Sequence, residues 1–187
     1  MEVKNISKSY GEDAVLKDVS LSIPDGSTVL ISGVSGRGKT TLLNIMMGII
    51  KADSGEVVGV PENISAVFQE NRLPADFLPR TCVRMTAPKT VSRDMINAHL
   101  AELGLGEHLE KPVKELSGGQ QRRVAIARAV LSESKAIFMD EPFNGLDRET
   151  KIRTIEYIKK YTRGKTLIVV SHAAEDAELL EAKEIRI

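Results

Sequence analysis

The sequence contains a single cysteine, Cys82, which excludes an intramolecular disulfide and favours a reducing compartment. Residues 1–15 lack the apolar core of a signal peptide. No uninterrupted apolar run approaches the roughly 20 residues that a membrane-spanning helix needs. We therefore expect the chain to serve a membrane only from outside the bilayer and through a partner.

Net charge is also lacking, because Lys+Arg and Asp+Glu both total 26. This balance provides no overall attraction to nucleic acid or anionic lipid, although it leaves room for a local basic patch. Internal repeats, heptad arrays and low-complexity tracts are absent as well. With 187 residues, of which 42% are hydrophobic, the chain is expected to form one domain with a substantial core.

The first third of the chain alternates strand-like and helix-like segments. Residues 15–23 and 27–32 predict two short strands joined by a turn at residues 24–26. The continuous apolar run over residues 40–50 predicts a buried helix, and residues 64–69 predict another strand.

The middle of the chain has a different character. Three prolines interrupt its early part, and residues 91–105 then show helical spacing of Met95, Ile96, Leu100 and Leu103. We expect a small, mostly helical subdomain at about 71–131, inserted into an α/β core. A helix at 118–131 is expected at the end of this range.

After the helix at 118–131, strand and helix patterns alternate again. Residues 136–140 and 166–171 are apolar strands, separated by a charged helix at about 148–162. The continuous runs IFM and LIVV indicate strands covered on both faces, as in a parallel sheet flanked by helices. The predicted fold class is therefore α/β.

A glycine-rich loop between the strand at 27–32 and the following helix matches G-x-x-x-x-G-K-[ST] in the required strand–loop–helix context. Its glycines let successive backbone N–H groups point at phosphate oxygens, and the helix start adds a positive field. Lys39 would reach the β- and γ-phosphates, Thr40 would ligate Mg²⁺, and Thr41 would add a hydroxyl or N–H. The motif predicts nucleotide binding without separating an ATPase from a GTPase or kinase. Its residues are Gly33, Val34, Ser35, Gly36, Arg37, Gly38, Lys39 and Thr40.

Polar side chains follow two of the buried strands. Asp140 and Glu141 come at the end of AIFMD, where Asp140 would hold Mg²⁺ and Glu141 would polarise the attacking water. His172 follows TLIVVS in the same way and would contact the γ-phosphate or orient Glu141. Taken alone, the acidic pair also fits an ordinary turn, and the histidine also fits a structural cap. His99 and His108 have no such context and receive no function.

A second anion-binding surface is predicted far from the first. Leu116 and Ser117 precede two glycines and Gln120 at the start of a helix, with Ser117 as the N-cap and the glycines exposing backbone N–H groups. One chain with one phosphate loop has no evident need of a second such surface, unless the two serve different molecules in a dimer.

The motifs GVSGRGKT, LSGGQ and IFMDE, in this order, resemble the nucleotide-binding subunits of ATP-binding cassette (ABC) proteins over essentially the whole chain. The resemblance implies a P-loop NTPase core with a small N-terminal antiparallel β part, ATP and Mg²⁺ as ligands, and a head-to-tail dimer. In that dimer Ser117, Gly118, Gly119 and Gln120 close on ATP held by the partner's phosphate loop.

The resemblance also assigns roles to single residues. Tyr10 would stack on adenine, and Gln69 would sense Mg²⁺ and contact a transmembrane partner. Asp147 would lie in the loop that crosses the dimer interface, and His172 would be the switch histidine. The implied catalytic residues are Glu141, His172, Gln69 and Lys39, and the implied metal ligands are Thr40, Gln69 and Asp140.

The resemblance further implies a separate membrane permease, with the chain cytoplasmic and peripheral on the inner face of the cell membrane. VFQENRLP and MDEPFNGLD are most similar to importers of the nitrate, sulfonate and taurine type, but the likeness fades over residues 76–94, so no substrate is named. A soluble ABC ATPase of DNA repair or translation is the alternative. It lacks support because the chain has no long coiled coil and only one cassette. A small-molecule kinase would leave LSGGQ and His172 unexplained.

Overall fold

The computed structural model describes every residue except Ser35 and Ala174. At its centre lies a five-stranded sheet of order β5-β6-β7-β3-β8, in which all neighbouring strands run parallel. The predicted parallel sheet is therefore confirmed. The strands are β3 (Thr28–Ser32), β5 (Ile64–Val67), β6 (Ala136–Asp140), β7 (Thr166–Val170) and β8 (Lys183–Arg186).

A second sheet of three antiparallel strands, in the order β2-β1-β4, packs beside the first. It confirms the expected N-terminal antiparallel part. Only β2 was foreseen from local pattern, because β1 and β4 are largely exposed and carry little apolar alternation. The strands are β1 (Glu2–Tyr10), β2 (Asp13–Ser22) and β4 (Ser54–Val58).

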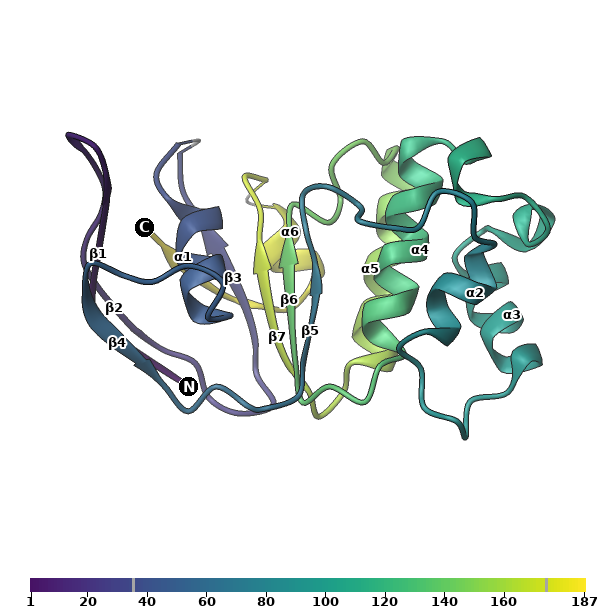
Figure 1. The fold of residues 1–187 in the computed structure, drawn as a ribbon, viewed down its shortest axis with the longest axis horizontal. Coiled ribbons are helices and arrows are strands. Elements are labelled where there is room, and N and C mark those ends of the chain that lie inside the picture. The colour runs from purple at the N-terminus through teal and green to yellow at the C-terminus, as the bar shows by residue number, and fades with distance from the viewer. Residues whose placement is uncertain (35, 174) are drawn as a thin grey trace.

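The side chains on the two faces of the central sheet belong to two separate hydrophobic clusters. Along β6, Ala136 and Phe138 face one cluster while Ile137 and Met139 face the other, as the two-residue period of a strand requires. The first cluster contains α1 (Lys39–Met46) and the antiparallel sheet. The second contains α4 (Gly118–Val130) and α5 (Arg148–Tyr161). Figure 1 shows α1 on one side of the central strands and α4 with α5 on the other.

The remaining helices cover the α4 side. They pack against α4 through buried apolar residues such as Cys82, Ile96 and Leu100. Met95 was expected to share this apolar face, but it is 48% exposed, because Ile96 one position on takes the inward direction. These elements are α2 (Pro79–Arg84), α3 (Arg93–Glu102) and the short 3₁₀ segments η1 (Gly106–His108) and η2 (Val113–Glu115), and α6 (Glu175–Leu179) follows β7.

Residues 71–131 thus contain three helices and two 3₁₀ segments. The assignment of this region as a separate subdomain stays a prediction. Among the described residues, no helix combines the length and the apolar character that crossing a membrane requires.

Candidate active site

The glycine-rich loop joins the carboxyl end of β3 to the start of α1, as predicted. Gly36 and Gly38 both have φ of 83°, a conformation that favours glycine. Gly38 is the N-cap of α1 and supplies no side-chain cap, so the first N–H groups of the helix are open to an anion. A Cβ at Gly38 would lie 2.7 Å from Val15 Cγ1, so the loop fits only glycine there. Ser35, also predicted to bind phosphate, lies outside the described residues.

Lys39 crosses back over this loop. Its Nζ donates to Gly33 O at 2.8 Å and to Val34 O at 3.1 Å, and the residue is only 7% exposed. A buried ammonium that donates to carbonyl oxygens gains from an anion placed beside it, since charge-assisted hydrogen bonds are the stronger ones. The neighbouring Thr41 is half-buried and Arg37 is exposed.

Asp140 lies at the end of β6 and is 3% exposed. Burial raises the pKa of its carboxyl, and a hydrogen bond with the Thr40 side chain opposes the increase. Its Oδ1 is buried and has no hydrogen-bond partner among the described residues. An unpartnered carboxylate oxygen beside a hydroxyl is the donor set that suits a hard divalent cation, so Thr40 and Asp140 fit the expected Mg²⁺.

Gln69 lies just beyond β5, the strand next to β6. Val67, the last residue of β5, pairs with Met139 of β6, and Gln69 follows two residues after Val67. The side chain of Gln69 is exposed, while its backbone carbonyl accepts a hydrogen bond from Arg122. The sheet therefore brings Gln69 to the edge that carries Asp140 and Glu141.

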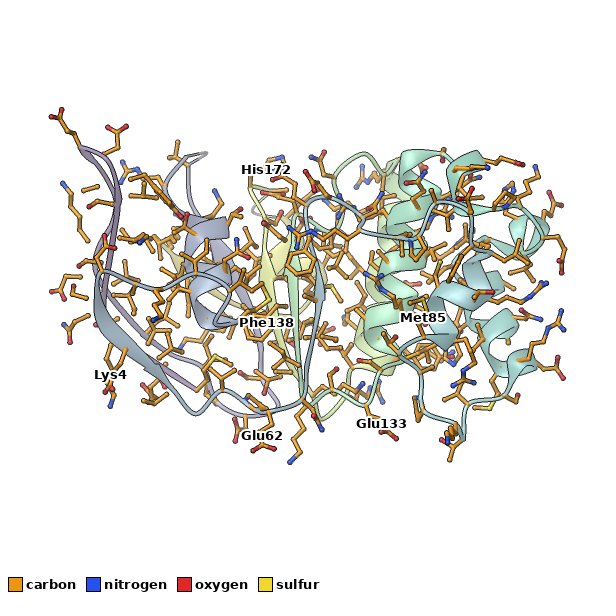
Figure 2. The ribbon with its side chains drawn as sticks, in the orientation of Figure 1. Lys4, Glu62, Met85, Glu133, Phe138 and His172 are labelled. Carbon is orange, nitrogen blue, oxygen red and sulfur yellow. The ribbon has the colours of Figure 1, made fainter. Side chains whose placement is uncertain are left out.

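Glu141 and His172 meet across the ends of β6 and β7. The Nδ1 of His172 lies 2.9 Å from Glu141 Oε2, and Glu141 N donates to Val170 O at 2.9 Å. Glu141 has φ of 47°, which is uncommon for a residue with a side chain and is found where the surroundings impose it. His172 is largely exposed at the upper edge in Figure 2, where a ligand would reach it.

The LSGGQ segment starts α4 with a capping box. Ser117 Oγ accepts from Gln120 N at 3.3 Å, and Gln120 Oε1 accepts from Ser117 N at 2.8 Å. A Cβ added at Gly118 would meet nothing within 4 Å, so this helix start is open to a ligand. The side chain of Gln120 takes part in the cap, and its expected contact with the nucleotide stays a prediction.

Asp147 caps the next helix, α5. Its Oδ1 accepts from Thr150 N at 3.0 Å, and this hydrogen bond lowers the pKa of the carboxyl. Asp147 lines one surface hollow of about 670 Å³ together with Gln69 and with Ser117 to Gly119. The structure thus gathers these predicted residues into one group, separate from the phosphate loop.

Tyr10 ends β1 in the antiparallel sheet. Its ring is 50% exposed, which makes it accessible for stacking, and Lys8 Nζ lies over the ring at 5.6 Å from its centroid. No hydrogen bond or cation–π contact joins it to the described residues of the phosphate loop, so its stacking on adenine stays a prediction.

Two residues in this region had received no predicted role. Arg122 of α4 is 7% exposed and donates to the carbonyls of Phe68 and Gln69. Burial lowers the pKa of its guanidinium, and the negative charges of Asp140 and Glu141 oppose this decrease. The Nε2 of His108 lies 2.9 Å from the Nε2 of Gln120. No local signal in the sequence pointed to either residue, because the burial of Arg122 and the contact of His108 are set by the fold.

The chain is similar to known proteins over most of its length. The ABC transporter family matches residues 16–144. The zinc transport system ATP-binding protein TroB of Treponema pallidum is 36% identical over 92% of this chain and 72% of its own length. The chain belongs to the ABC transporter family. The aliphatic sulfonates import ATP-binding protein SsuB 2 of Pseudomonas syringae pv. syringae is 35% identical over 99% of this chain and 68% of its own.

Solved ABC structures have the same fold. The dimeric cassette MJ0796 is 30% identical with a TM-score of 0.83, over 99% of this chain and 94% of that one. A dimeric post-hydrolysis state of MJ0796 bound to ADP and Pi is 31% identical with a TM-score of 0.81, over 95% and 90%. The expected α/β cassette fold and ATPase activity are confirmed, and a DNA-repair or translation ATPase is not favoured.

The predicted likeness to sulfonate-type ABC importers is confirmed by the SsuB proteins. It does not single out a substrate, because ABC proteins named for zinc and for manganese transport match to a similar degree.

Proposed function

We propose that two copies of this ABC ATPase bind two ATP molecules head to tail and that hydrolysis drives a separate membrane permease. One observation carries the proposal: the chain has two open, glycine-lined helix starts on opposite sides of one sheet. The α1 start carries Lys39, while the α4 start carries Ser117 and Gly118.

The two helix starts nevertheless face the same edge of the molecule. α4 ends just before Glu133, which lies at the opposite edge from His172 in Figure 2, so its N-terminus points toward the His172 edge. The central sheet stands between α4 and the chain's own phosphate loop (Figure 1). A second copy, rotated by a two-fold axis, would bring the start of its α4 over the phosphate loop of the first.

On the phosphate-loop side, each part of ATP has a candidate partner. The loop N–H groups and Lys39 suit the β- and γ-phosphates, because both provide donors and positive charge. Tyr10 offers an exposed ring for the adenine. Thr40 and Asp140, with Gln69, are the proposed ligands of Mg²⁺, which would neutralise charge that develops on the phosphates.

Hydrolysis is proposed to depend on Glu141 and His172. Glu141 accepts a proton from water as the water oxygen bonds to the γ-phosphorus, and the bond from that phosphorus to the bridging oxygen of ADP breaks. A carboxylate only accepts hydrogen bonds, so Nδ1 of His172 carries the hydrogen that holds Glu141.

The dimer would close on ATP and open after hydrolysis. Two triphosphates between the copies join them by hydrogen bonds to Lys39 on one side and to Ser117 and Gly118 on the other. Loss of the γ-phosphate removes contacts made only in the closed form, so the equilibrium moves to the open form. Such an ATP-dependent equilibrium can move whatever is attached to the helical region.

The attached partner is proposed to be a membrane permease, with the ATPase on the cytoplasmic face. The curated relatives are ATP-binding proteins of transport systems, and one of them, MacB of Campylobacter jejuni, is named as an ATP-binding/permease protein. Their named substrates range from zinc to sulfonates and macrolides at 35–36% identity, so no substrate follows from them.

The head-to-tail site is tested by Ser117→Arg. The added side chain fills the space that the partner's γ-phosphate would occupy, so ATP turnover should fall to background while each monomer still binds ATP. Ser92→Arg is the matched control, because Ser92 also caps a helix and its Oγ accepts from Met95 N at 3.2 Å. If Ser117→Arg hydrolyses ATP at the parent rate, the cross-subunit site is wrong.

A further inference from the structure

His108 lies at the end of η1, ten residues before the α4 helix, on the stretch that leads into LSGGQ. Its Nε2 is 2.9 Å from Nε2 of Gln120, and its buried Nδ1 has no hydrogen-bond partner in the part of the chain that the structure describes. A buried polar atom without a partner is uncommon in folded proteins and calls for an explanation.

The capping box determines which atom of the Gln120 amide faces His108. Ser117 N is a donor, so the Gln120 atom facing it must be the carbonyl oxygen, and the amide NH₂ of Gln120 must face His108. His108 therefore accepts at Nε2 and carries its hydrogen on Nδ1, the unpartnered atom. The contact requires a side chain that can accept a hydrogen bond at this place.

The contact completes a short relay. His108 Nε2 accepts from the amide nitrogen of Gln120, and Gln120 Oε1 accepts from Ser117 N. Ser117 Oγ in turn accepts from Gln120 N. The backbone of this stretch is already anchored by Leu105 and Val113, which are buried in the large cluster. Packing alone thus leaves no need for a polar group at His108.

We infer that His108 is a positioning residue: it fixes the rotamer of Gln120 and so sets the start of α4 for the partner's ATP. This inference rests on the proposed head-to-tail site. His108 itself would touch no nucleotide. Its loss should weaken closure of the dimer while leaving ATP binding by the monomer unchanged.

The test uses Glu141→Gln as the parent, with the concentration of ATP and Mg²⁺ needed for half-maximal dimer formation as the readout. His108→Leu removes the acceptor at similar size and should raise that concentration about five- to tenfold, as loss of a helix cap does. His108→Gln places an oxygen near the lost Nε2 and should restore the parent value. Binding of a fluorescent ATP analogue under monomeric conditions should stay unchanged in both.

A double-mutant cycle separates this relay from a general packing effect. If His108 acts through Gln120, then His108→Leu should add little once Gln120→Ala is present, because the two changes remove the same contact. Fully additive effects would overturn the inference. So would equal behaviour of His108→Leu and His108→Gln. If His108→Leu does not fold, His108→Asn, whose amide is too short to reach Gln120, replaces it.

Ser117→Arg in the same parent distinguishes the two proposals. If Ser117→Arg still dimerises with ATP, the head-to-tail site itself is wrong. If Ser117→Arg blocks dimerisation while His108→Leu has no effect, the site stands and only the role of His108 is overturned. Glu107→Gln, next to His108 on η1, should match the parent in every measurement.

Discussion

Nδ1 of His172 lies 2.9 Å from Oε2 of Glu141, although the two residues are 31 positions apart. The ends of β6 and β7 bring them together, because Asp140 and Val170 pair across these two parallel strands. Glu141 is held at a positive φ by its surroundings, so its carboxylate has a defined direction. The two side chains of this pair are thus already in contact within the folded chain.

Glu141→Gln should keep ATP binding but trap a closed dimer. The amide cannot take the proton of the attacking water, so turnover should fall about 100-fold or more. Size-exclusion chromatography with ATP and Mg²⁺ should then show the dimer. Glu62→Gln is the control, because Glu62 lies at the far edge of the molecule in Figure 2. Normal hydrolysis by Glu141→Gln would show that Glu141 is not the base.

Lys39→Ala should weaken ATP binding. It removes a buried ammonium that donates to Gly33 O and Val34 O, and whose charge-assisted hydrogen bonds to phosphate are worth about 1.5–3 kcal/mol. The dissociation constant for ATP, measured by calorimetry, should rise about tenfold or more. Lys51→Ala, an exposed lysine beyond α1, should bind like the parent. Unchanged affinity of Lys39→Ala would count against the phosphate-loop assignment.

His172→Ala should lower kcat about tenfold or more while the dissociation constant for ATP stays the same, because the histidine orients Glu141 and not the nucleotide in the ground state. The effects of His172→Ala and Glu141→Gln should not be additive, since both act on one pair of side chains. Single-turnover hydrolysis measures this directly. Two independent, additive losses would contradict the pairing seen in the structure.

The stability of the protein should fall as the pH is lowered through the ordinary histidine range. Burial against Tyr157 and Tyr161 lowers the pKa of His99, Lys160 adds to this, and Glu102 opposes it. The folded state therefore binds fewer protons than the unfolded state, and the free energy of unfolding decreases from about pH 6.5 down to the lower, folded-state pKa.

His99→Phe keeps an aromatic ring in this cluster and removes the titration. Urea unfolding of parent and variant at several pH values between about 5 and 7.5 should show a smaller decrease in the variant. The neutral side chain of His99 hydrogen-bonds Tyr157 OH at 3.1 Å, so the variant should also be less stable at neutral pH. Identical pH slopes in the two proteins would contradict the assignment to His99.

Contiguous motifs and their flanking strands were predictable from the sequence. The phosphate loop, Asp140 with Glu141, and the start of α4 are each defined within a few residues, and the glycine conformations they need follow from local sterics. The buried strands were predictable because their apolar runs are continuous. Strands β1, β4 and β8 were not, since they are short or exposed and depend on pairing partners.

The sequence by itself determined which chemical groups this ATPase carries and in what order. Only the tertiary structure decided which of them meet: Thr40 with Asp140, Glu141 with His172, and His108 with Gln120. Contacts of this kind depend on strand order, on register and on which side of the sheet each helix packs. Those are set by burial of the whole apolar surface at once, so no local pattern of residues contains them.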